Sequence, residues 1–243
     1  MIPAGTKKLI KKALEEDLIP LGDIGSSLID EHLLARANVV IKSAGVVAGL
    51  FCVTQTYKQL SQEITYKFFC KEGDEVVPGS VCIELEGPLA LILAGERTAL
   101  NFLGHLCGVA TFTNAFVKKV KAINPKVEIL DTRKTLPGLR ALQKYAVRMG
   151  GAKNHRGNLS EAIMIKDNYL AVEDMPSLVK KARELWPMRT VEVECDTIEQ
   201  VKLACSIGVD VIMCDNMSYD EIVEAVKIVR RQSTQIAVEV SGG

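Results

Sequence analysis

The chain has 243 residues, of which 48% are hydrophobic and 25% are charged, and its 30 basic side chains balance its 30 acidic ones. This length can bury one large core or two modest ones, and the composition is typical of a soluble globular protein rather than a disordered or fibrous one. The neutral overall charge argues against a nucleic acid as partner, because a nucleic acid needs a wide basic surface.

No uninterrupted apolar run reaches the roughly 18 to 20 residues needed to cross a bilayer, and the first residues lack a signal-peptide core. The seven cysteines are scattered without a CxxC pair, and an odd number cannot pair completely. Free thiols are typical of a reducing compartment, whereas disulfides and zinc sites need paired spacings. We therefore expect a cytoplasmic protein that does not associate with a membrane.

The predicted secondary structure changes twice along the N-terminal part of the chain. Residues 6–18 carry apolar positions at helical spacing, which predicts a packing helix. Residues 33–88 consist of short β-rich runs punctuated by Gly and Pro, which predicts a small strand-rich domain. Residues 89–123 then become helical, as two apolar stretches that meet near Cys107 and Gly108.

The first of these helical stretches is apolar almost all round, which predicts a buried helix linking two domains. Arg97 is the exception within it. A buried guanidinium is costly unless it is paired, so Arg97 should meet either a protein carboxylate or an anionic ligand. His105 is expected to have a protein partner, because no metal or catalytic set surrounds it.

After Pro125 short β-branched runs alternate with helical stretches. The runs are residues 126–131, 162–167, 189–196, 209–216 and 235–243, and the helical stretches are 175–186, 197–208 and 219–231. Strands that alternate with helices at this spacing predict successive βα units and a parallel sheet. An open sheet and a closed barrel both satisfy that pattern.

Nearly every one of these strands ends on residues able to do chemistry. They are Asp131 with Arg133 and Lys134, then Lys166, Glu194, Asp215, and finally Ser241, Gly242 and Gly243. In a βα barrel such positions converge on one face, whereas an open sheet concentrates its ligand groups near a single switch point. The pattern therefore favours a barrel, and the glycines of the last strand would offer backbone N–H groups to a phosphate.

Positive charge is concentrated between residues 127 and 168. The basic residues there are Arg133, Lys134, Arg140, Lys144, Arg148, Lys153, Arg156 and Lys166, against only Glu128, Asp131, Glu161 and Asp167. A neutral protein with one cationic segment is suited to a small polyanion. For Lys144 and Arg148 a solvated helix face explains the charge equally well.

Seven sequence blocks together resemble the quinolinate phosphoribosyltransferase family. They are GERTALNFLGHLCGVAT (95–111), LDTRKTLPGLRALQKYAVRMGG (130–151), NHR (154–156), IKDN (165–168), VEVE (191–194), CDN (214–216) and VEVSGG (238–243). The blocks follow the family's order over essentially the whole chain, and DTRKT with NHR and KDN is highly specific. The EDL…GD pattern of residues 16–23 is similar to the family's N-terminus.

The resemblance implies an α/β protein with an N-terminal α/β sandwich domain over residues 1–110, including the linking helix, and an incomplete TIM-like βα barrel over residues 111–243 that carries the active site. It also implies a homodimer, with or without higher assembly, in which one subunit completes the other's site. The reaction condenses quinolinate with phosphoribosyl pyrophosphate and releases pyrophosphate and carbon dioxide. The product is nicotinate mononucleotide for NAD synthesis, and Mg²⁺ accompanies the pyrophosphate.

The family's site residues carry over onto matching positions of this chain. The implied quinolinate contacts are Arg97 from the partner subunit, Arg133, His155, Arg156 and Lys166. The implied contacts with phosphoribosyl pyrophosphate are Thr132, Lys134, Glu194, Asp215, Ser241, Gly242 and Gly243. Lys134, Lys166, Glu194 and Asp215 are the implied catalytic residues, and the last two would hold Mg²⁺ directly or through water, since this hard ion prefers oxygen ligands.

The sequence also departs from the family pattern. Tyr169 stands where the family commonly has His, and Gly157 and Asn158 replace the usual apolar residue and Gly after Arg156. We expect these changes to alter loop shape while leaving the charged groups intact. Family members continue beyond the SGG sequence by at least one βα unit, so a molecule ending at Gly243 would have an open barrel and an incomplete phosphate site.

Three other functions fit part of the sequence. The molybdenum-transport-associated phosphoribosyltransferase-like group shares the TRKT and HR blocks, but the KDN and VEVE blocks argue against it. A Schiff-base aldolase could use Lys134 or Lys166 at a barrel strand end. A catalytically inactive quinolinate-binding subunit would dimerise and turn nothing over.

Overall fold

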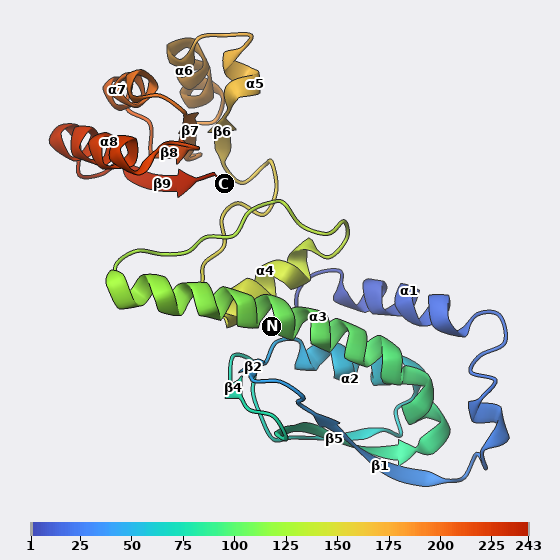
Figure 1. Ribbon diagram of the computed structural model, residues 1–243. Helices are drawn as coiled ribbons and strands as arrows, with labels where there is room; N and C mark the ends of the chain where they lie inside the picture. The colour runs from blue at the N-terminus through green and yellow to red at the C-terminus, as the bar shows by residue number, and fades with distance from the viewer. Residues whose placement is uncertain (1, 243) are drawn as a thin grey trace. The chain divides into compact units, whose positions relative to one another are not determined.

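The computed structural model describes residues 2–242, and the chain forms two compact units, Met1–Gly157 and Asn158–Gly243. The first unit combines helices with antiparallel strands, and the second combines helices with a parallel sheet (Figure 1).

Four helices and five strands build the first unit, together with a short 3-10 turn at Ser26–Leu28. They are α1 (Thr6–Leu18), β1 (Leu34–Val40), β2 (Gly45–Val46), α2 (Leu50–Leu60), β3 (Thr65–Phe68), β4 (Glu75–Val76), β5 (Val81–Pro88), α3 (Leu89–Ile123) and α4 (Arg140–Met149). The antiparallel sheet has the order β1-β5-β3, and β2 and β4 form a separate two-stranded ladder.

The block predicted to be rich in strands also contains a buried helix, α2, which the sequence analysis did not distinguish. Leu50, Val53 and Tyr57 are buried on one side of α2 and belong to the same core as Ile83 and Leu85 of β5. Their spacing of three and four residues is that of a helix face. The β-branched and aromatic residues of this segment raised its strand propensity, and packing between α3 and the sheet overrode it.

Helix α3 is one continuous helix of 35 residues, not two stretches that meet near Cys107 and Gly108. A glycine inside a helix costs about 1 kcal/mol relative to alanine, which a long packed helix tolerates. The buried residues Ala99 and Leu103 pack on α2 and β5, whereas Leu106 and Ala110 pack with α1 and α4. Helix α3 therefore belongs to both cores of this unit.

By length and composition alone, α3 is long and apolar enough to cross a membrane. Its most apolar 18-residue window has a mean hydropathy of 1.2, and 17% of that window is buried. Core helices of globular proteins meet the same criteria, and α3 contributes to two packed cores here.

The first predicted strand of the parallel sheet, residues 126–131, is reduced to a single bridge between Leu130 and Lys153. Two main-chain hydrogen bonds fix it, from Lys153 N to Ile129 O at 2.9 Å and from Asp131 N to Lys153 O at 3.2 Å. The chain around Val127 is exposed, so burial does not extend the pairing. This bridge nevertheless brings two segments that are 23 residues apart into contact.

The second unit has the predicted alternation of strands and helices. It contains β6 (Ile163–Ile165), α5 (Asp167–Leu170), α6 (Met175–Leu185), β7 (Val191–Cys195), α7 (Ile198–Ser206), β8 (Val211–Asp215), α8 (Tyr219–Gln232) and β9 (Ala237–Ser241). All strand pairs are parallel, in the order β6-β7-β8-β9. Capping boxes start α7 and α8, where Thr197 pairs with Gln200 and Ser218 with Glu221.

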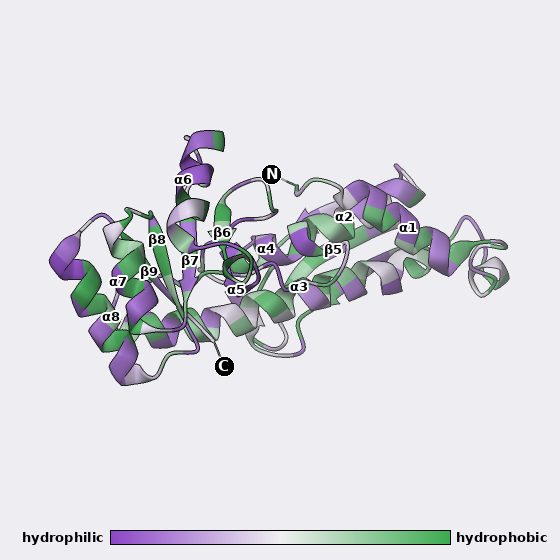
Figure 2. Cartoon of the chain, turned by 90° about the horizontal axis from the view of Figure 1, so that it is seen from above, coloured by the Kyte–Doolittle hydropathy of each residue, from purple (hydrophilic) through white to green (hydrophobic). Residues whose placement is uncertain are grey.

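The two faces of this parallel sheet differ in chemistry. One face carries Val191, Val193, Ile212 and Cys214, which are fully buried in a core shared with α6, α7 and α8. Hydrophobic and hydrophilic residues alternate along α8, so that one side of the helix joins that core (Figure 2). Because side chains alternate along a strand, the polar residues of the same strands must lie on the opposite face.

Candidate active site

The polar face of the parallel sheet carries most of the predicted site residues of the second unit. Lys166 directly follows β6, Glu194 lies in β7, Asp215 ends β8 and Ser241 ends β9. The register places Asp215 opposite Ser241 and Glu194 opposite Met213. The carboxyl ends of these parallel strands therefore bring the four residues to one edge, as the sequence predicted.

Lys166 and Glu194 form an ion pair between their side chains. The Lys166 side chain is 39% exposed and that of Glu194 is 15% exposed. This pair therefore lies at the surface of the unit, where its ammonium group can also reach a ligand. A Schiff base would instead start from a neutral amine.

Asp215, Asn216 and Gly242 lie close together at the ends of the neighbouring strands β8 and β9. Asn216 Nδ2 donates to Asp215 Oδ2 at 2.7 Å, and Asn216 N donates to the carbonyl of Ser241 at 3.1 Å. Gly242 has φ +122°, and a Cβ there would lie 2.6 Å from Asn216 Oδ1. Only glycine fits this position. Gly243, also a predicted phosphate contact, lies outside the described residues.

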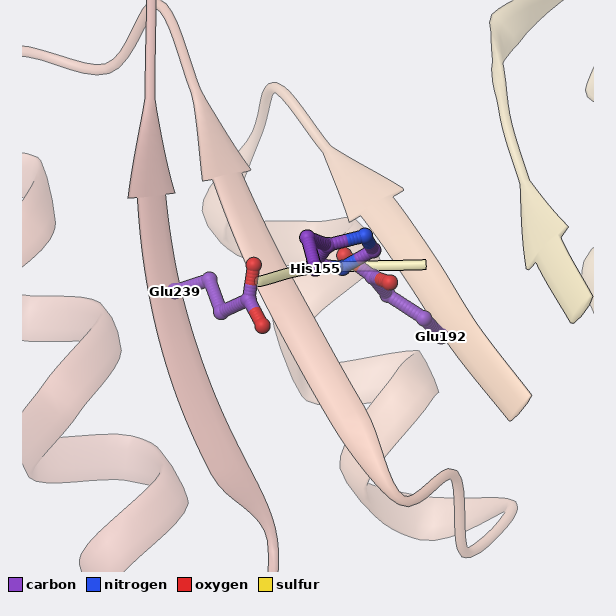
Figure 3. Close-up of side chains that lie close together, drawn as sticks. All are labelled: His155, Glu192 and Glu239. Carbon is purple, nitrogen blue, oxygen red and sulfur yellow. The ribbon is translucent and has the colours of Figure 1, made fainter. Parts of the chain in front are cut away.

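Two further carboxylates lie on the same polar face, and the sequence reasoning missed both. Glu192 of β7 and Glu239 of β9 have carboxylate oxygens within 4.8 Å of each other, and Figure 3 shows the two side chains approaching across β8. Glu192 is only 2% exposed. Each lies two residues before Glu194 or Ser241, so the two-residue strand period could have found them.

The loop after the Leu130 bridge holds three predicted residues of the first unit. Thr132 Oγ1 accepts a hydrogen bond from Lys134 N at 3.0 Å, and both residues are exposed. Arg133 is half-buried, and its Nε atom has no hydrogen-bond partner among residues 2–242. A buried N–H without a partner is costly, so this guanidinium is suited to an anionic ligand.

Lys144 is buried beneath this loop, so a solvated helix face is the wrong interpretation for it. Its ammonium group forms an ion pair with Asp131 and donates to the carbonyl of His155 at 2.9 Å. The exposed fractions of the Lys144 and Asp131 side chains are 8% and 7%. Asp131 also accepts from His155 N at 2.9 Å and from Asn154 Nδ2 at 2.5 Å.

These contacts place the predicted residues His155 and Arg156 beside the loop that carries Arg133. Both residues are half-buried, and the main chain of His155 is fixed on both sides by Asp131 and Lys144. Arg148 remains exposed on α4 and donates to Asn154 Oδ1. The first unit therefore brings Thr132, Arg133 and Lys134 close to His155 and Arg156.

Arg97 differs from its prediction, because its side chain is 71% exposed rather than buried. It lies on the outer face of α3, where it approaches Glu96 at 3.9 Å. The cost of burial therefore gives no reason for a ligand at Arg97. His105 does have a protein partner, Gln143, whose Nε2 lies 3.0 Å from the imidazole Nε2.

All seven cysteines, which lie within the described residues, are free thiols. Burial raises the pKa of Cys52 and of Cys195 to about 12. Because the thiolate is the nucleophile, these two groups do not act as nucleophiles at neutral pH. The chemistry of the site therefore rests on the cations and carboxylates.

Family models match both parts of the chain. The model described as quinolinate phosphoribosyl transferase, N-terminal domain, matches residues 23–107, and the model for the C-terminal domain matches residues 109–243. The chain belongs to the quinolinate phosphoribosyltransferase family. The resemblance inferred from the sequence blocks is thereby confirmed.

Individual quinolinate phosphoribosyltransferase relatives extend over nearly the whole chain. A Bacillus subtilis protein named probable nicotinate-nucleotide pyrophosphorylase (carboxylating) is 40% identical over 98% of this chain and 81% of its own length. A Methanocaldococcus jannaschii protein of the same name is 38% identical over 97% and 84%. The solved nicotinate-nucleotide pyrophosphorylase from Francisella tularensis matches with a TM-score of 0.92 and 35% identity over 100% of this chain and 84% of its own.

These matches confirm the predicted α/β fold class of a quinolinate phosphoribosyltransferase, with an antiparallel-sheet part and a parallel-sheet part. They do not favour the molybdenum-transport-associated group or an inactive subunit, because the relatives carry the pyrophosphorylase name. The domain boundary after residue 110 remains a prediction; it falls inside α3. Tyr169, which departs from the family pattern, is exposed on α5.

Proposed function

We propose that the chain condenses quinolinate with phosphoribosyl pyrophosphate to nicotinate mononucleotide, pyrophosphate and carbon dioxide, in the synthesis of NAD. Family membership supports this activity. The structural observation that carries it is the buried Nε of Arg133, which has no hydrogen-bond partner among the described residues. A substrate carboxylate would satisfy this donor and form the charge-assisted pair that a guanidinium makes best.

Quinolinate carries two adjacent carboxylates, so one cation cannot hold it in a single orientation. In our proposal Arg133 and Arg156 bind these carboxylates, with His155 beside them and Lys166 as a further cation. The support is the bridge at Leu130 and the Asp131 hydrogen bonds, which hold the segments of Arg133 and Arg156 together. Planar guanidinium groups then fix the ring as well as bind its charge.

The reaction needs placement more than activation. The pyridine nitrogen forms a bond to the ribose carbon as the bond from that carbon to the pyrophosphate oxygen breaks, through an oxocarbenium-like state. The ring, now positively charged at nitrogen, takes up the electron pair left when the adjacent carboxylate departs as carbon dioxide. A proton from solvent then replaces the lost group. Positioning and electrostatic stabilisation supply the catalysis, and no covalent nucleophile is needed.

Lys134 and Lys166 are the cations that we assign to the departing pyrophosphate, with Thr132, Ser241, Gly242 and Gly243 at the phosphates. The exposed side chain of Lys134 supports its role, because it can reach a charged ligand. Lys166 would exchange its pairing with Glu194 for contacts with substrate as the site fills. A developing negative charge beside these cations would be stabilised more than the ground state.

Glu194 and Asp215 fit Mg²⁺, because both are carboxylates at the ends of adjacent parallel strands. We propose that they hold the ion directly or through water, as hard oxygen ligands do. When bound, Mg²⁺ would neutralise charge on the pyrophosphate. Glu194 would also keep Lys166 in place, and Asp215 would contact the ribose hydroxyls.

A homodimer with shared sites is part of the proposal, with Arg97 reaching quinolinate bound by the partner subunit. Its support is the exposure of Arg97, whose contact with Glu96 is long at 3.9 Å. Leu93 and Phe112 are exposed apolar residues on the same helix, as an interface would require. We also propose a cytoplasmic location, in keeping with seven free thiols.

The test is release of carbon dioxide from carboxyl-labelled quinolinate by the 243-residue chain with Mg²⁺. Release that depends on phosphoribosyl pyrophosphate, and is lost with Arg133→Ala, is the expected result. Omission of phosphoribosyl pyrophosphate and, separately, addition of a chelator are the controls. If quinolinate binds in calorimetry but no carbon dioxide is released, the chain is a binding protein and the proposed turnover is wrong.

A further inference from the structure

Arg140 is a basic residue of the cationic segment that the proposed function leaves without a role. It is the first residue of α4 and is half-buried. A cation at the N-terminal end of a helix opposes the helix dipole, so Arg140 does not stabilise α4 through its charge. Its contacts with other segments must therefore account for its presence there.

The guanidinium of Arg140 reaches three acceptors in two segments. Nε donates to Thr135 Oγ1 at 3.1 Å, Nη1 donates to the carbonyl of Gly157 at 3.1 Å, and Nη2 lies 3.5 Å from the carbonyl of Arg133. The three acceptors are all neutral, so geometry rather than charge pairing determines these contacts. A guanidinium has five donors on three nitrogens in a fixed plane, whereas a lysine ammonium carries its three donors on a single nitrogen.

The two segments are those that carry the proposed quinolinate ligands. Arg133 contributes its own carbonyl to Arg140, and Gly157 directly follows Arg156. Neighbouring side chains of α4 hold the same segments at other points. Gln143 Oε1 accepts from Leu136 N at 3.0 Å, and Lys144 donates to the carbonyl of His155 at 2.9 Å. Lys144 also joins the two segments, through Asp131 and His155, whereas Arg140 bonds to the main chain of Arg133 itself and of Gly157, the residue next to Arg156.

We propose that Arg140 is a positioning residue that sets the separation of Arg133 and Arg156, so that both guanidinium groups meet one quinolinate molecule. This inference rests on the proposed function for the identity of the ligand. Arg140 itself touches main chain and the Thr135 hydroxyl, and it acts on substrate through the two arginines. The Leu130 bridge and the Asp131 contacts still join the segments when Arg140 is lost, but the main chain at Arg133 and Gly157 is no longer tied. The two arginines can then shift relative to each other, which weakens the recognition of two adjacent carboxylates.

Arg183 offers a matched control in the second unit. It lies on α6, and it also bonds to three acceptors, two of them carbonyls: Asp210 Oδ2 at 2.9 Å, the carbonyl of Gly208 at 3.0 Å and that of Arg189 at 3.4 Å. These acceptors precede β7 and β8, at the ends opposite to Glu194 and Asp215. Arg183→Ala therefore removes a similar set of bonds without touching a segment that carries a proposed ligand.

The experiment compares Arg140→Ala, Arg140→Lys and Arg183→Ala with the wild type in the full chain. The first measurement is hydrogen exchange in peptides that cover residues 129–136 and 153–157. The second is the KM of each substrate. We expect Arg140→Ala to speed exchange in both segments and to raise the quinolinate KM roughly tenfold or more, because small misplacements of binding groups are costly. The KM for phosphoribosyl pyrophosphate should change less, and Arg140→Lys should fall between wild type and Ala.

Unchanged exchange in both segments of Arg140→Ala would overturn the inference, as would an equal rise of the quinolinate KM in Arg183→Ala. If Arg140→Ala does not fold, Arg140→Lys decides by the same two measurements. A wild type without turnover would contradict the proposed function instead. In that case hydrogen exchange still shows whether Arg140 holds the two segments together.

Discussion

Each compact unit contains a lysine–carboxylate pair among or beside the proposed ligand residues, and these two pairs differ in exposure. In the first unit, the Lys144 and Asp131 side chains are 8% and 7% exposed, and both make further hydrogen bonds, to the main chain of His155 and, for Asp131, to the Asn154 amide. In the second unit, Lys166 and Glu194 form a similar contact, but the lysine side chain is 39% exposed. A lysine and a carboxylate therefore form a buried pair in the first unit and a partly exposed pair in the second.

Exposure separates a structural cation, Lys144, from a proposed catalytic one, Lys166. Lys144 has protein partners in its surroundings and no access to a ligand, so it fixes the segments above it. Lys166 has one strong partner and an open side, so a substrate can share or replace that partner. Charge and sequence position alone do not separate these cases, because both lysines lie in the same cationic segment.

The largest effect is expected for Lys166→Ala on turnover. If Lys166 stabilises the transition state as we propose, its removal should lower kcat by roughly 10² to 10³-fold. The free energy of unfolding should fall less than in Lys144→Ala, because the Lys166 side chain is 39% exposed and that of Lys144 is 8% exposed. Steady-state rates and urea denaturation measure the two quantities. Near-normal turnover would remove Lys166 from the catalytic residues, and the same test applies to Lys134→Ala.

Lys144→Ala should give the opposite result. It leaves the Asp131 carboxylate buried without its cation, which should lower the free energy of unfolding by about 3 to 5 kcal/mol. Urea denaturation of Lys144→Ala and Lys166→Ala under the same conditions gives the comparison directly. Equal stabilities of the two variants would mean that exposure does not distinguish the pairs.

Arg97 extends the comparison to a cation whose side chain is 71% exposed. We expect Arg97→Ala to weaken quinolinate binding roughly tenfold, as the loss of one charge-assisted contact would. Calorimetry measures the affinity. Mixed dimers of Arg97→Ala and Lys166→Ala subunits should recover part of the activity if the sites are shared. No recovery in verified mixed dimers would argue against a contribution across the subunits.

The smallest effect concerns Glu72, a carboxylate held by main-chain groups rather than by a cation. It accepts from Gly49 N at 2.7 Å and from Phe51 N at 3.4 Å at the start of α2, and burial raises the pKa of its carboxyl. The folded state therefore binds this proton more tightly than the unfolded state, and the resulting stability is lost as the pH rises through the raised pKa. The Tm of Glu72→Gln minus that of the wild type should be larger at pH 7.5 than at pH 4.5. A pH-independent difference would show that the carboxyl does not titrate in this range.

The strands and helices of the second unit could be predicted because local signals agreed there. Short β-branched runs, capping residues such as Thr197 and Ser218, and amphipathic helices all favoured one arrangement. The strand ends also identified Lys166, Glu194 and Asp215 as neighbours, because parallel strands end at the same edge. The roles of these residues in the reaction remain predictions.

The remaining features depend on contacts between distant parts of the chain. Helix α2 was not recognised in the sequence because its residues are rich in strand formers. Its packing against α3 and β5 favours the helix. The burial of Lys144 depends on Asp131 and on the segment of His155, and no local pattern reveals it. Glu192 and Glu239 could have been identified from the sequence, because the two-residue period of a strand places them on the same face as Glu194 and Ser241.

The continuity of α3 has a mechanical consequence. At 1.5 Å per residue, its 35 residues form a rod about 52 Å long. Labels on exposed positions near its two ends, such as Leu93 and Ile123, would be about 45 Å apart along the axis and would keep a narrow distance distribution. Distances from labels on α3 to labels elsewhere can therefore report movements of other parts of the protein relative to this helix.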